Sequence, residues 1–197
     1  MSLRLLAACG VCLLVGSVCG ADVINGDFSQ AILEAESWTA GADGLGAWYG
    51  TGYTTENGSA ELSFSGPGRN WGQLKRERRA IVQALEMPEA GDYTWGVDCK
   101  LTDYHRQFCY WQAYGVKEGA EIDLTGGPTW RRNLPGARVL GGGYLPNRHD
   151  DEQWHTYSHN LSISQRNADR YDYVAFVLVG TRHHDELLAY DNFTTSI

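Results

Sequence analysis

The stretch GDYTWGVDCK, residues 91–100, decides the fold class. Large apolar side chains alternate along it with small or polar ones: Tyr93, Trp95, Val97 and Cys99 against Thr94, Gly96, Asp98 and Lys100. Successive side chains of a β-strand point to opposite faces, so this pattern predicts a half-buried antiparallel strand.

The same alternation recurs on both sides of this stretch, and helical periodicity is nearly absent. We predict further strands at 58–64, 79–87, 107–116, 154–163, 171–180 and 187–197. Gly, Pro, Asn and Asp mark the connections, as at 65–68 and 126–128. The chain is therefore predicted to be all-β, an antiparallel β-sandwich or jelly roll. The weakly patterned residues 117–152, with Gly141–Gly143, are predicted to be a long loop.

The first residues are typical of a secretory leader. Arg4 precedes an apolar run, Leu5–Val18, and small residues follow before a predicted cut after residue 21. The run is shorter than the ~20 residues that a membrane-spanning helix needs, which argues against that alternative. We expect 1–21 to be a signal peptide, 22–197 to be one β-sandwich domain, and the mature protein to be secreted, extracellular or held at the cell surface.

The net charge and the motifs of the sequence disfavour several classes of function. The chain has 16 Lys and Arg against 24 Asp and Glu, a net charge of −8, and loss of Arg4 leaves 15 against 24, or −9. A nucleic-acid partner or an anionic membrane is therefore disfavoured. The sequence contains no nucleophile elbow, P-loop or zinc-ligand spacing, which favours a protein that is not an enzyme. A small polysaccharide-active enzyme stays an alternative, because the separation of two catalytic carboxylates is a three-dimensional quantity.

Two cysteines, Cys99 and Cys109, remain after loss of the leader. In an oxidising compartment the simplest outcome is a disulfide between them, and the alternative is two buried thiols. A bridge between neighbouring strands would point both cysteines to the same side. Trp111 would then face the core.

The opposite face of the same strand would be turned outward. It carries Tyr110, Gln112 and Tyr114, with Asp98 beside them on the neighbouring strand. Aromatic faces beside amides and carboxylates suit the apolar C–H faces and polar rims of sugar rings. The alternative is that residues 117–152 cover this face and that the tyrosines serve in packing.

Several short segments together resemble a known family. In chain order they are VINGDF (23–28), Trp38, GSAEL (58–62), IVQALEMPEAGDYTWGVDCK (81–100), WHTYSHNLSI (154–163) and AYDNF (189–193). They resemble the landmarks of jelly-roll carbohydrate-binding modules with the galactose-binding-like fold, the xylan- and glucan-binding modules often appended to secreted glycosidases. Trp38, Trp95 and Trp154 match the landmark strands, so we expect them in the core.

The resemblance implies a secreted, non-catalytic module that binds a polysaccharide or another glycan. The alternative is a structural or adhesive extracellular protein that keeps the fold without sugar binding. Further binding candidates are Trp48, Trp71 and Trp130, because a tryptophan in a turn-like segment is more available to a ligand than one in a strand core.

The resemblance also implies that the two chain ends are neighbours and that a structural Ca²⁺ lies near them. Its ligands would be the backbone carbonyl of Asp27, the side chain of Ser29, an acid such as Glu56, and Asp191. Ser29 stands where the family usually has Glu, and a lost carboxylate weakens a calcium site. The alternative is that Asp191 and its neighbour Asn192 only cap a sheet edge.

Overall fold

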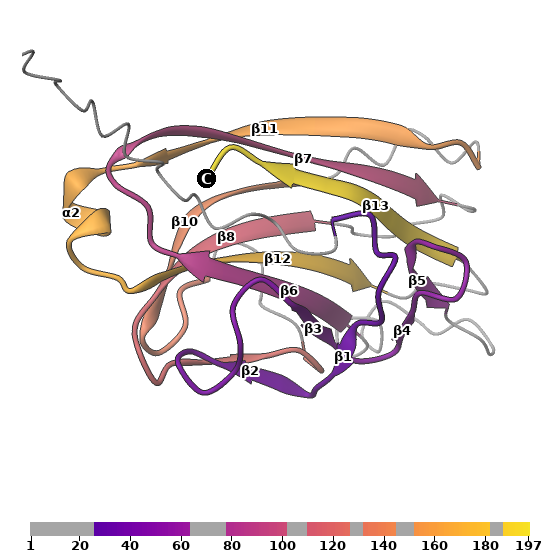
Figure 1. Cartoon of the computed structure of the whole chain (residues 1–197), viewed down its shortest axis with the longest axis horizontal. Helices are drawn as coiled ribbons and strands as arrows, with labels where there is room; N and C mark the ends of the chain where they lie inside the picture. Colours follow the sequence, from indigo (N-terminus) through magenta and orange to yellow (C-terminus); the bar gives the residue numbers. More distant parts are fainter. Residues whose placement is uncertain (1–25, 64–77, 102–109, 127–131, 145–151, 182–186) are drawn as a thin grey trace, which may run out of the picture.

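The computed structural model describes residues 26–63, 78–101, 110–126, 132–144, 152–181 and 187–197, and strands dominate them. Two sheets pack face to face, and a small third sheet lies against one of them (Figure 1). The predicted all-β sandwich is confirmed.

The smaller of the two main sheets has five antiparallel strands. In spatial order they are β11 (His155–Ile163), β7 (Gly91–Leu101), β13 (Leu187–Thr195), β5 (Ala60–Ser63) and β4 (Tyr53–Thr54). Strand β7 contains the stretch that decided the fold class, and its burial alternates as predicted.

The other main sheet has six strands. They are β1 (Leu33–Glu34), β3 (Trp48–Gly50), β6 (Arg78–Glu86), β12 (Tyr173–Thr181), β8 (Tyr110–Val116) and β10 (Ala137–Tyr144). Only the short β1–β3 pair is parallel among the described pairings of this sheet.

The chain changes sheet at almost every connection from β5 onward. Strands β5, β7, β11 and β13 belong to the five-stranded sheet, and β6, β8, β10 and β12 belong to the six-stranded one. A short helix, α2 (Gln165–Ala168), joins β11 to β12, and the Ser164 hydroxyl accepts a hydrogen bond from the Asn167 N–H at its start. Repeated crossing between two sheets is the topology of a jelly roll.

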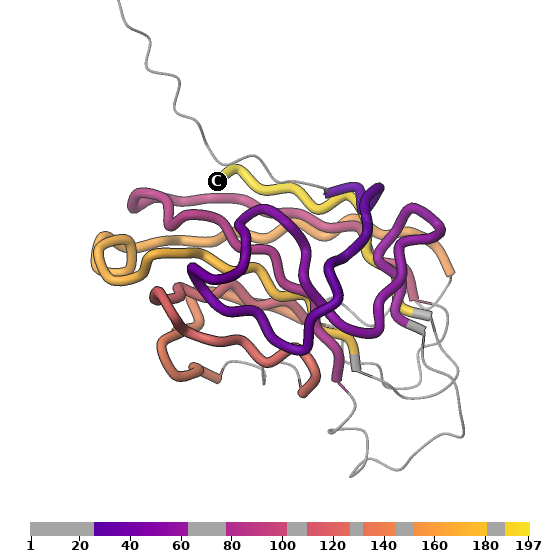
Figure 2. The backbone as a smooth tube through the Cα atoms, turned by 60° about the horizontal axis from the view of Figure 1, so that its bottom comes forward, coloured from indigo at the N-terminus to yellow at the C-terminus, as the bar shows by residue number. Residues whose placement is uncertain are grey.

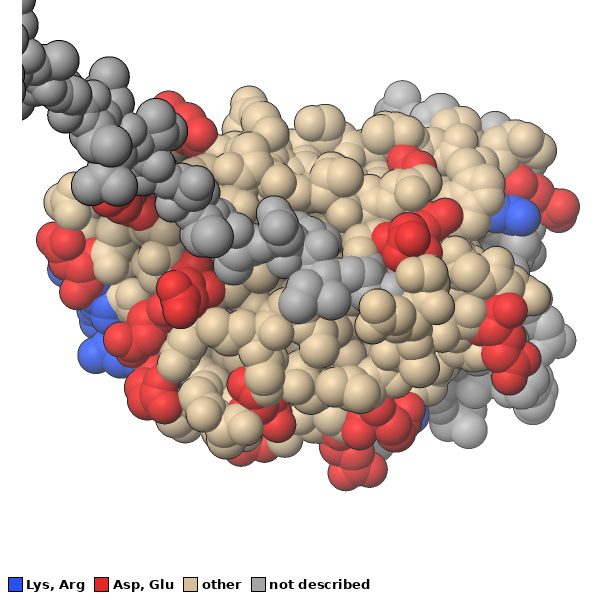
Figure 3. Space-filling view, viewed as in Figure 1, with Lys and Arg blue, Asp and Glu red and all other residues tan. Residues whose placement is uncertain are grey.

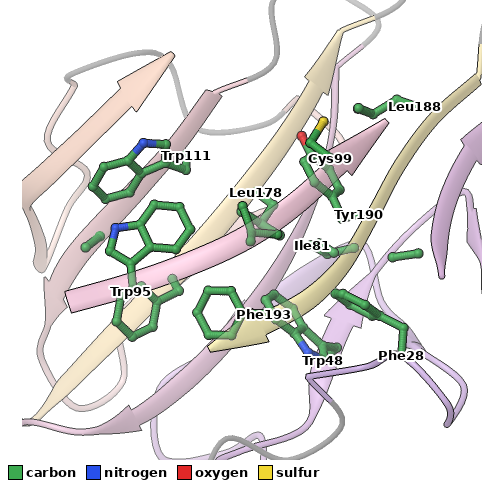
Figure 4. Close-up of a cluster of buried hydrophobic side chains, with 14 of the residues drawn as sticks. Phe28, Trp48, Ile81, Trp95, Cys99, Trp111, Leu178, Leu188, Tyr190 and Phe193 are labelled. Carbon is green, nitrogen blue, oxygen red and sulfur yellow. The ribbon is translucent and has the colours of Figure 1, made fainter. Parts of the chain in front are cut away.

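An inner core fills the space between the two main sheets. Figure 4 shows Trp95 and Trp111 facing one another from opposite sheets, with ring centroids 4.1 Å apart. Phe28, Trp48 and Phe193 pack farther along the same space, and Trp48 lies 5.1 Å from each of the other two rings. Large rings from both sheets therefore close the sandwich by burying apolar surface.

An outer core lies on the other face of the six-stranded sheet. A two-stranded sheet, β2 (Ser37–Thr39) with β9 (Glu121–Asp123), packs over that face with Trp38 and Ile122 fully buried. Figure 2, which brings this side forward, shows these segments lying over the longer strands. Ala80 and Ala175 on the sheet belong to the same buried cluster as Trp38.

The strands predicted from alternation are confirmed, with boundaries shifted by a few residues. The predicted loop at 117–152 is wrong, because β9 and β10 lie within it. Three glycines of β10 hid the alternation, and packing accounts for one of them: a Cβ at Gly143 would lie 2.6 Å from the Trp111 Nε1 atom. Gly143 thus lets the edge strand approach an indole.

The two ends of the described chain are neighbours, as the resemblance implied. The Phe193 N–H donates to the Gly26 carbonyl over 2.7 Å. Phe28 has a left-handed backbone, φ 49°, and its side chain is fully buried. This residue fixes the first segment beside β13.

Candidate functional site

The prediction that one face of β8 is open to solvent is wrong. Tyr110, Gln112 and Tyr114 do point away from the inner core, but their side chains are buried in or beside the outer core. Alternation correctly placed the side chains on one face, and the β2–β9 layer then covers that face. The alternative in which residues from the 117–152 stretch cover the tyrosines is the one observed, since β9 belongs to that stretch.

Hydrogen bonds and pKa shifts agree with this burial. The Gln112 Nε2 donates to the Tyr114 hydroxyl, which donates to the Arg132 carbonyl at 3.2 Å. Burial raises the pKa of Tyr110 to about 12 and moves the pKa of Tyr114 upward as well. The two phenols therefore stay neutral and serve the packing of the outer core.

The strand pairing assumed for the disulfide is also wrong. Strand β7 carries Cys99 in the five-stranded sheet, whereas β8 belongs to the six-stranded sheet. Cys99 is buried in the inner core, and Cys109 lies outside the described residues, so the bridge itself stays a prediction. Asp98 lies far from the tyrosines in this topology, on the outer face of β7, where it accepts from the Thr156 hydroxyl at 2.6 Å.

The tryptophans divide differently from the prediction. Trp38 and Trp95 lie in the core as expected. The prediction that Trp48 binds a ligand from a loop is wrong, because Trp48 belongs to β3 and is 1% exposed. The prediction that Trp154 lies in the core is also wrong, because Trp154 precedes β11 and is 43% exposed. Trp71 and Trp130 lie outside the described residues and stay predictions.

Many strand ends meet at one end of the sandwich, which we call the rim. Register places them together: Leu187 pairs with Ser63, Thr181 with Arg78, Leu188 with Leu101, and Tyr144 with Tyr110. Strand β11 begins there as well, since His155 pairs with Cys99. The rim therefore draws residues from both sheets, at the right of Figure 1.

Two exposed aromatic side chains lie on the rim. Tyr144 ends β10 and is 45% exposed, and Trp154 precedes β11. The ring of Tyr144 meets the buried ring of Tyr110 edge to face, with centroids 6.1 Å apart, which supports it from below. The sequence held a signal for Trp154 that we did not use, since Glu152, Gln153 and His155 around it are all polar.

Carboxylates gather where the first segment meets β13. Burial raises the pKa of Asp191, and the negative charges of Asp98 and Asp27 raise it further, against the Asn192 N–H that donates to its carboxylate. The Asn192 side chain also donates to Asp98 at 2.8 Å. Asp27 and Asp191, two of the predicted calcium ligands, are thus close enough to repel each other.

The other two predicted ligands fit less well. The Ser29 hydroxyl donates to the Asp27 carboxylate at 2.8 Å, and this bond lowers the pKa of Asp27. Glu56 is exposed in the turn after β4, where its backbone N–H donates to the Thr54 hydroxyl at 3.4 Å. Among the described residues no three acidic, histidine or cysteine side chains converge on a metal position, so a cation here would need backbone oxygens as well. The residues therefore fit calcium in part.

A half-buried histidine packs against both indoles of the inner core. His159 stacks on Trp95 with centroids 5.0 Å apart and lies 4.5 Å from the Trp111 ring. Burial lowers its pKa below the ordinary value of 6.5, and within the described part of the chain its Nε2 atom has no hydrogen-bond partner. The fold therefore favours neutral His159.

We expect the free energy of unfolding to fall as the pH drops below about 6.5, because the unfolded chain then binds a proton at His159 that the folded chain disfavours. Above that pH both states are neutral at this residue and the contribution is complete. The test is urea unfolding of the wild type and His159→Phe at a series of pH values. The wild type should lose more stability on acidification than the variant, and parallel losses would contradict the assignment.

The comparisons with known proteins concern the backbone arrangement. No protein-family model and no curated protein matches the chain in sequence. Among solved structures, a CBM4 carbohydrate-binding module is 15% identical over 88% of this chain and 98% of that one, with a TM-score of 0.49. The K3 adhesin domain of Lys-gingipain from Porphyromonas gingivalis is 17% identical over 89% and 99%, with a TM-score of 0.46. A cyclase from a Fischerella species is 12% identical over 70% and 62%, with a TM-score of 0.41.

Further similar structures include carbohydrate-binding modules of families 16, 61 and 22. Within the described residues, none of the helices has the length and apolar character needed to cross a bilayer.

Proposed function

We propose that this protein is a secreted, non-catalytic glycan-binding protein whose sugar-binding surface lies on the rim. One observation carries the proposal: two large aromatic side chains, Tyr144 and Trp154, are about half exposed at the end of the sandwich where both sheets contribute strand ends. The leader predicted at 1–21 is the basis for the extracellular location.

The physical argument concerns the cost of exposing these rings. Among the described residues three large apolar side chains are exposed, and the two aromatic ones, Tyr144 and Trp154, both lie on the rim. A sugar ring has an apolar C–H face that covers an aromatic face, and a polar rim that stays hydrated. Tyr144 is held in place by Tyr110 beneath it, so binding loses little side-chain entropy there. A shallow surface of this kind gives micromolar to millimolar affinity, because buried area alone does not make binding tight.

Removing either ring should weaken binding. We expect Tyr144→Ala and Trp154→Ala each to lower the affinity for an oligosaccharide about 2- to 10-fold, the effect of one aromatic contact. The measurement is isothermal titration with xylan, β-glucan, mannan and galactan oligomers, with the melting temperature as the check of folding.

The matched control is Leu33→Ala. Leu33 is also an exposed apolar residue, 47% exposed, but it lies on β1 at the edge of the six-stranded sheet that is opposite to β10. Its removal should leave affinity unchanged. Equal losses in all three variants, or none in the two aromatic ones, would remove the rim as the site. Loss of binding only in Trp71→Ala would transfer the stacking role to that residue.

We also propose that Ca²⁺ binds where Asp27 and Asp191 meet. The raised pKa of Asp191 supports it, because a cation would relieve the repulsion among Asp27, Asp98 and Asp191. Bound calcium would supply positive charge that ties the first segment to β13.

The expected result is a melting temperature several degrees higher in millimolar Ca²⁺ than in chelator, because a ligand bound only by the folded state stabilises it. Asp191→Asn should remove the response to Ca²⁺ without destabilising the protein in chelator, since the variant also loses the repulsion. Identical wild-type melts with and without Ca²⁺ would show that the ion has no role.

A further inference from the structure

A pocket opens at the end of the six-stranded sheet opposite the rim. Val116, the last residue of β8, pairs with both Ala137 and Tyr173, which lie at the starts of β10 and β12. The residues next to these strand ends therefore converge. They enclose about 220 Å³, and the lining includes Lys117, Asn133, Arg138, Arg170 and Tyr171.

The wall of this pocket is built on fixed backbone. Leu134 and Ala137 exchange two backbone hydrogen bonds of 2.9 and 3.0 Å around a turn in which Gly136 has φ 72°. The Gly136 carbonyl accepts from the Lys117 N–H at 3.0 Å, which ties the turn to the end of β8. The Asn133 side-chain oxygen accepts from the Val139 N–H, which leaves its NH₂ group as a donor. The pocket is thus shaped before any ligand arrives.

Its charge is opposite to that of the protein. The chain carries a net charge of −8, yet this pocket is lined by three basic side chains and by no acidic one. Figure 3 shows acidic side chains spread over the surface and a group of basic ones near the end where α2 lies.

The acids next to the lining residues in the sequence have hydrogen-bond partners of their own. Asp169 accepts from the Gln165 side chain at 2.8 Å. Asp172 accepts from the Glu118 N–H at 2.9 Å, and the Glu118 carboxylate accepts from the Tyr173 hydroxyl. Arg170 packs over the Tyr171 ring, with its guanidinium carbon 5.5 Å from the centroid. A cation–π contact holds that planar group while its N–H donors stay available.

We propose that this pocket binds the carboxylate or sulfate group of an acidic polysaccharide. The inference rests on the proposed glycan-binding function and specifies its ligand class. Two guanidinium groups and an ammonium match the oxygens of such a group through charge-assisted hydrogen bonds, whereas a neutral sugar offers them no opposite charge. Acidic residues far from the pocket do not oppose this at physiological salt, because charges more than ~8 Å apart are largely screened. Glu118, Asp169 and Asp172 are next to lining residues in the sequence and reduce the net positive charge there.

The test compares acidic and neutral oligosaccharides on the whole mature protein. Oligogalacturonate, a sulfated galactan oligomer and a neutral galactan oligomer are titrated into the wild type, Arg138→Gln/Arg170→Gln and Arg166→Gln at 0.15 M salt. Arg166 is the matched control, because it is an exposed arginine on α2 that does not line the pocket. Lys117→Gln is a second pocket variant, and melting temperatures verify that each variant is folded.

We expect the wild type to bind an acidic oligomer more tightly than the neutral one. The double variant should lose about 10-fold or more of the acidic affinity and none of the neutral affinity, and Arg166→Gln should match the wild type. The two acidic probes distinguish carboxylate from sulfate. Binding of the neutral oligomer alone, or equal acidic affinity in the wild type and double variant, would overturn the pocket and leave the glycan-binding proposal standing. Binding of none of the three would overturn the pocket, and the glycan-binding proposal would fall with it only if xylan, β-glucan and mannan oligomers also failed to bind.

Discussion

Replacing Trp38 by alanine should lower the free energy of unfolding by about 3–5 kcal/mol, the cost of deleting a large buried ring and leaving a cavity. Trp38 is fully buried in the outer core and meets the ring of Tyr173 edge to face at 6.4 Å. Its loss removes a fully buried ring from the β2–β9 layer that covers the six-stranded sheet. Urea unfolding measures the effect.

The matched control is Trp154→Ala, which deletes the same atoms from an exposed position on the rim. It should change stability by no more than about 0.5–1 kcal/mol. If the two variants lose the same stability, the β2–β9 layer is not a packed core and the burial of Tyr110 and Tyr114 has another cause.

Adding one methyl group at Gly143 should cost about 1–3 kcal/mol through overpacking. A Cβ there would lie 2.6 Å from the Trp111 Nε1 atom and 3.3 Å from the His159 ring. The Trp111 ring is itself packed on Trp95 at 4.1 Å, so it has little space in which to move. Chemical denaturation of Gly143→Ala measures this cost.

Gly91→Ala is the control for the Gly143 variant. A Cβ at Gly91 meets the Tyr93 ring at an ordinary 3.5 Å, so the substitution should change stability by less than about 1 kcal/mol. Equal stability of the two variants would show that β10 can move away from Trp111, and would remove the packing reason for this glycine.

The sequence predicted the sandwich well because alternation is a local property. In β7 each apolar side chain at an odd position packs inward, and nothing distant is needed to see the pattern. Strand β10 was not predicted because glycines have no side chain that could show the alternation. The reason for Gly143 is the Trp111 ring on the neighbouring strand β8, which the local sequence does not reveal.

The candidate site was predicted less well because exposure is not local. Alternation placed Tyr110 and Tyr114 on the correct face of β8, but the cover comes from Trp38 and Ile122, which are distant in sequence from one another. The pairing of Cys99 failed for a related reason, since consecutive strands of a jelly roll lie in different sheets. Trp48 was predicted to be exposed because glycines flank it, but it is buried. Trp154 was predicted to be buried, although its neighbours in the sequence are polar, and it is exposed.

The measurement that tests the central claim most directly is a map of backbone amide shifts in the ¹⁵N-labelled mature protein as a neutral oligosaccharide that it binds is titrated in. The account predicts shifts that centre on the rim, at Tyr144, Trp154 and the strand ends beside them, with the β2–β9 cover unchanged. Shifts centred on the outer face of the five-stranded sheet, around Asp98 and Thr156, or no shifts with any glycan, would contradict it.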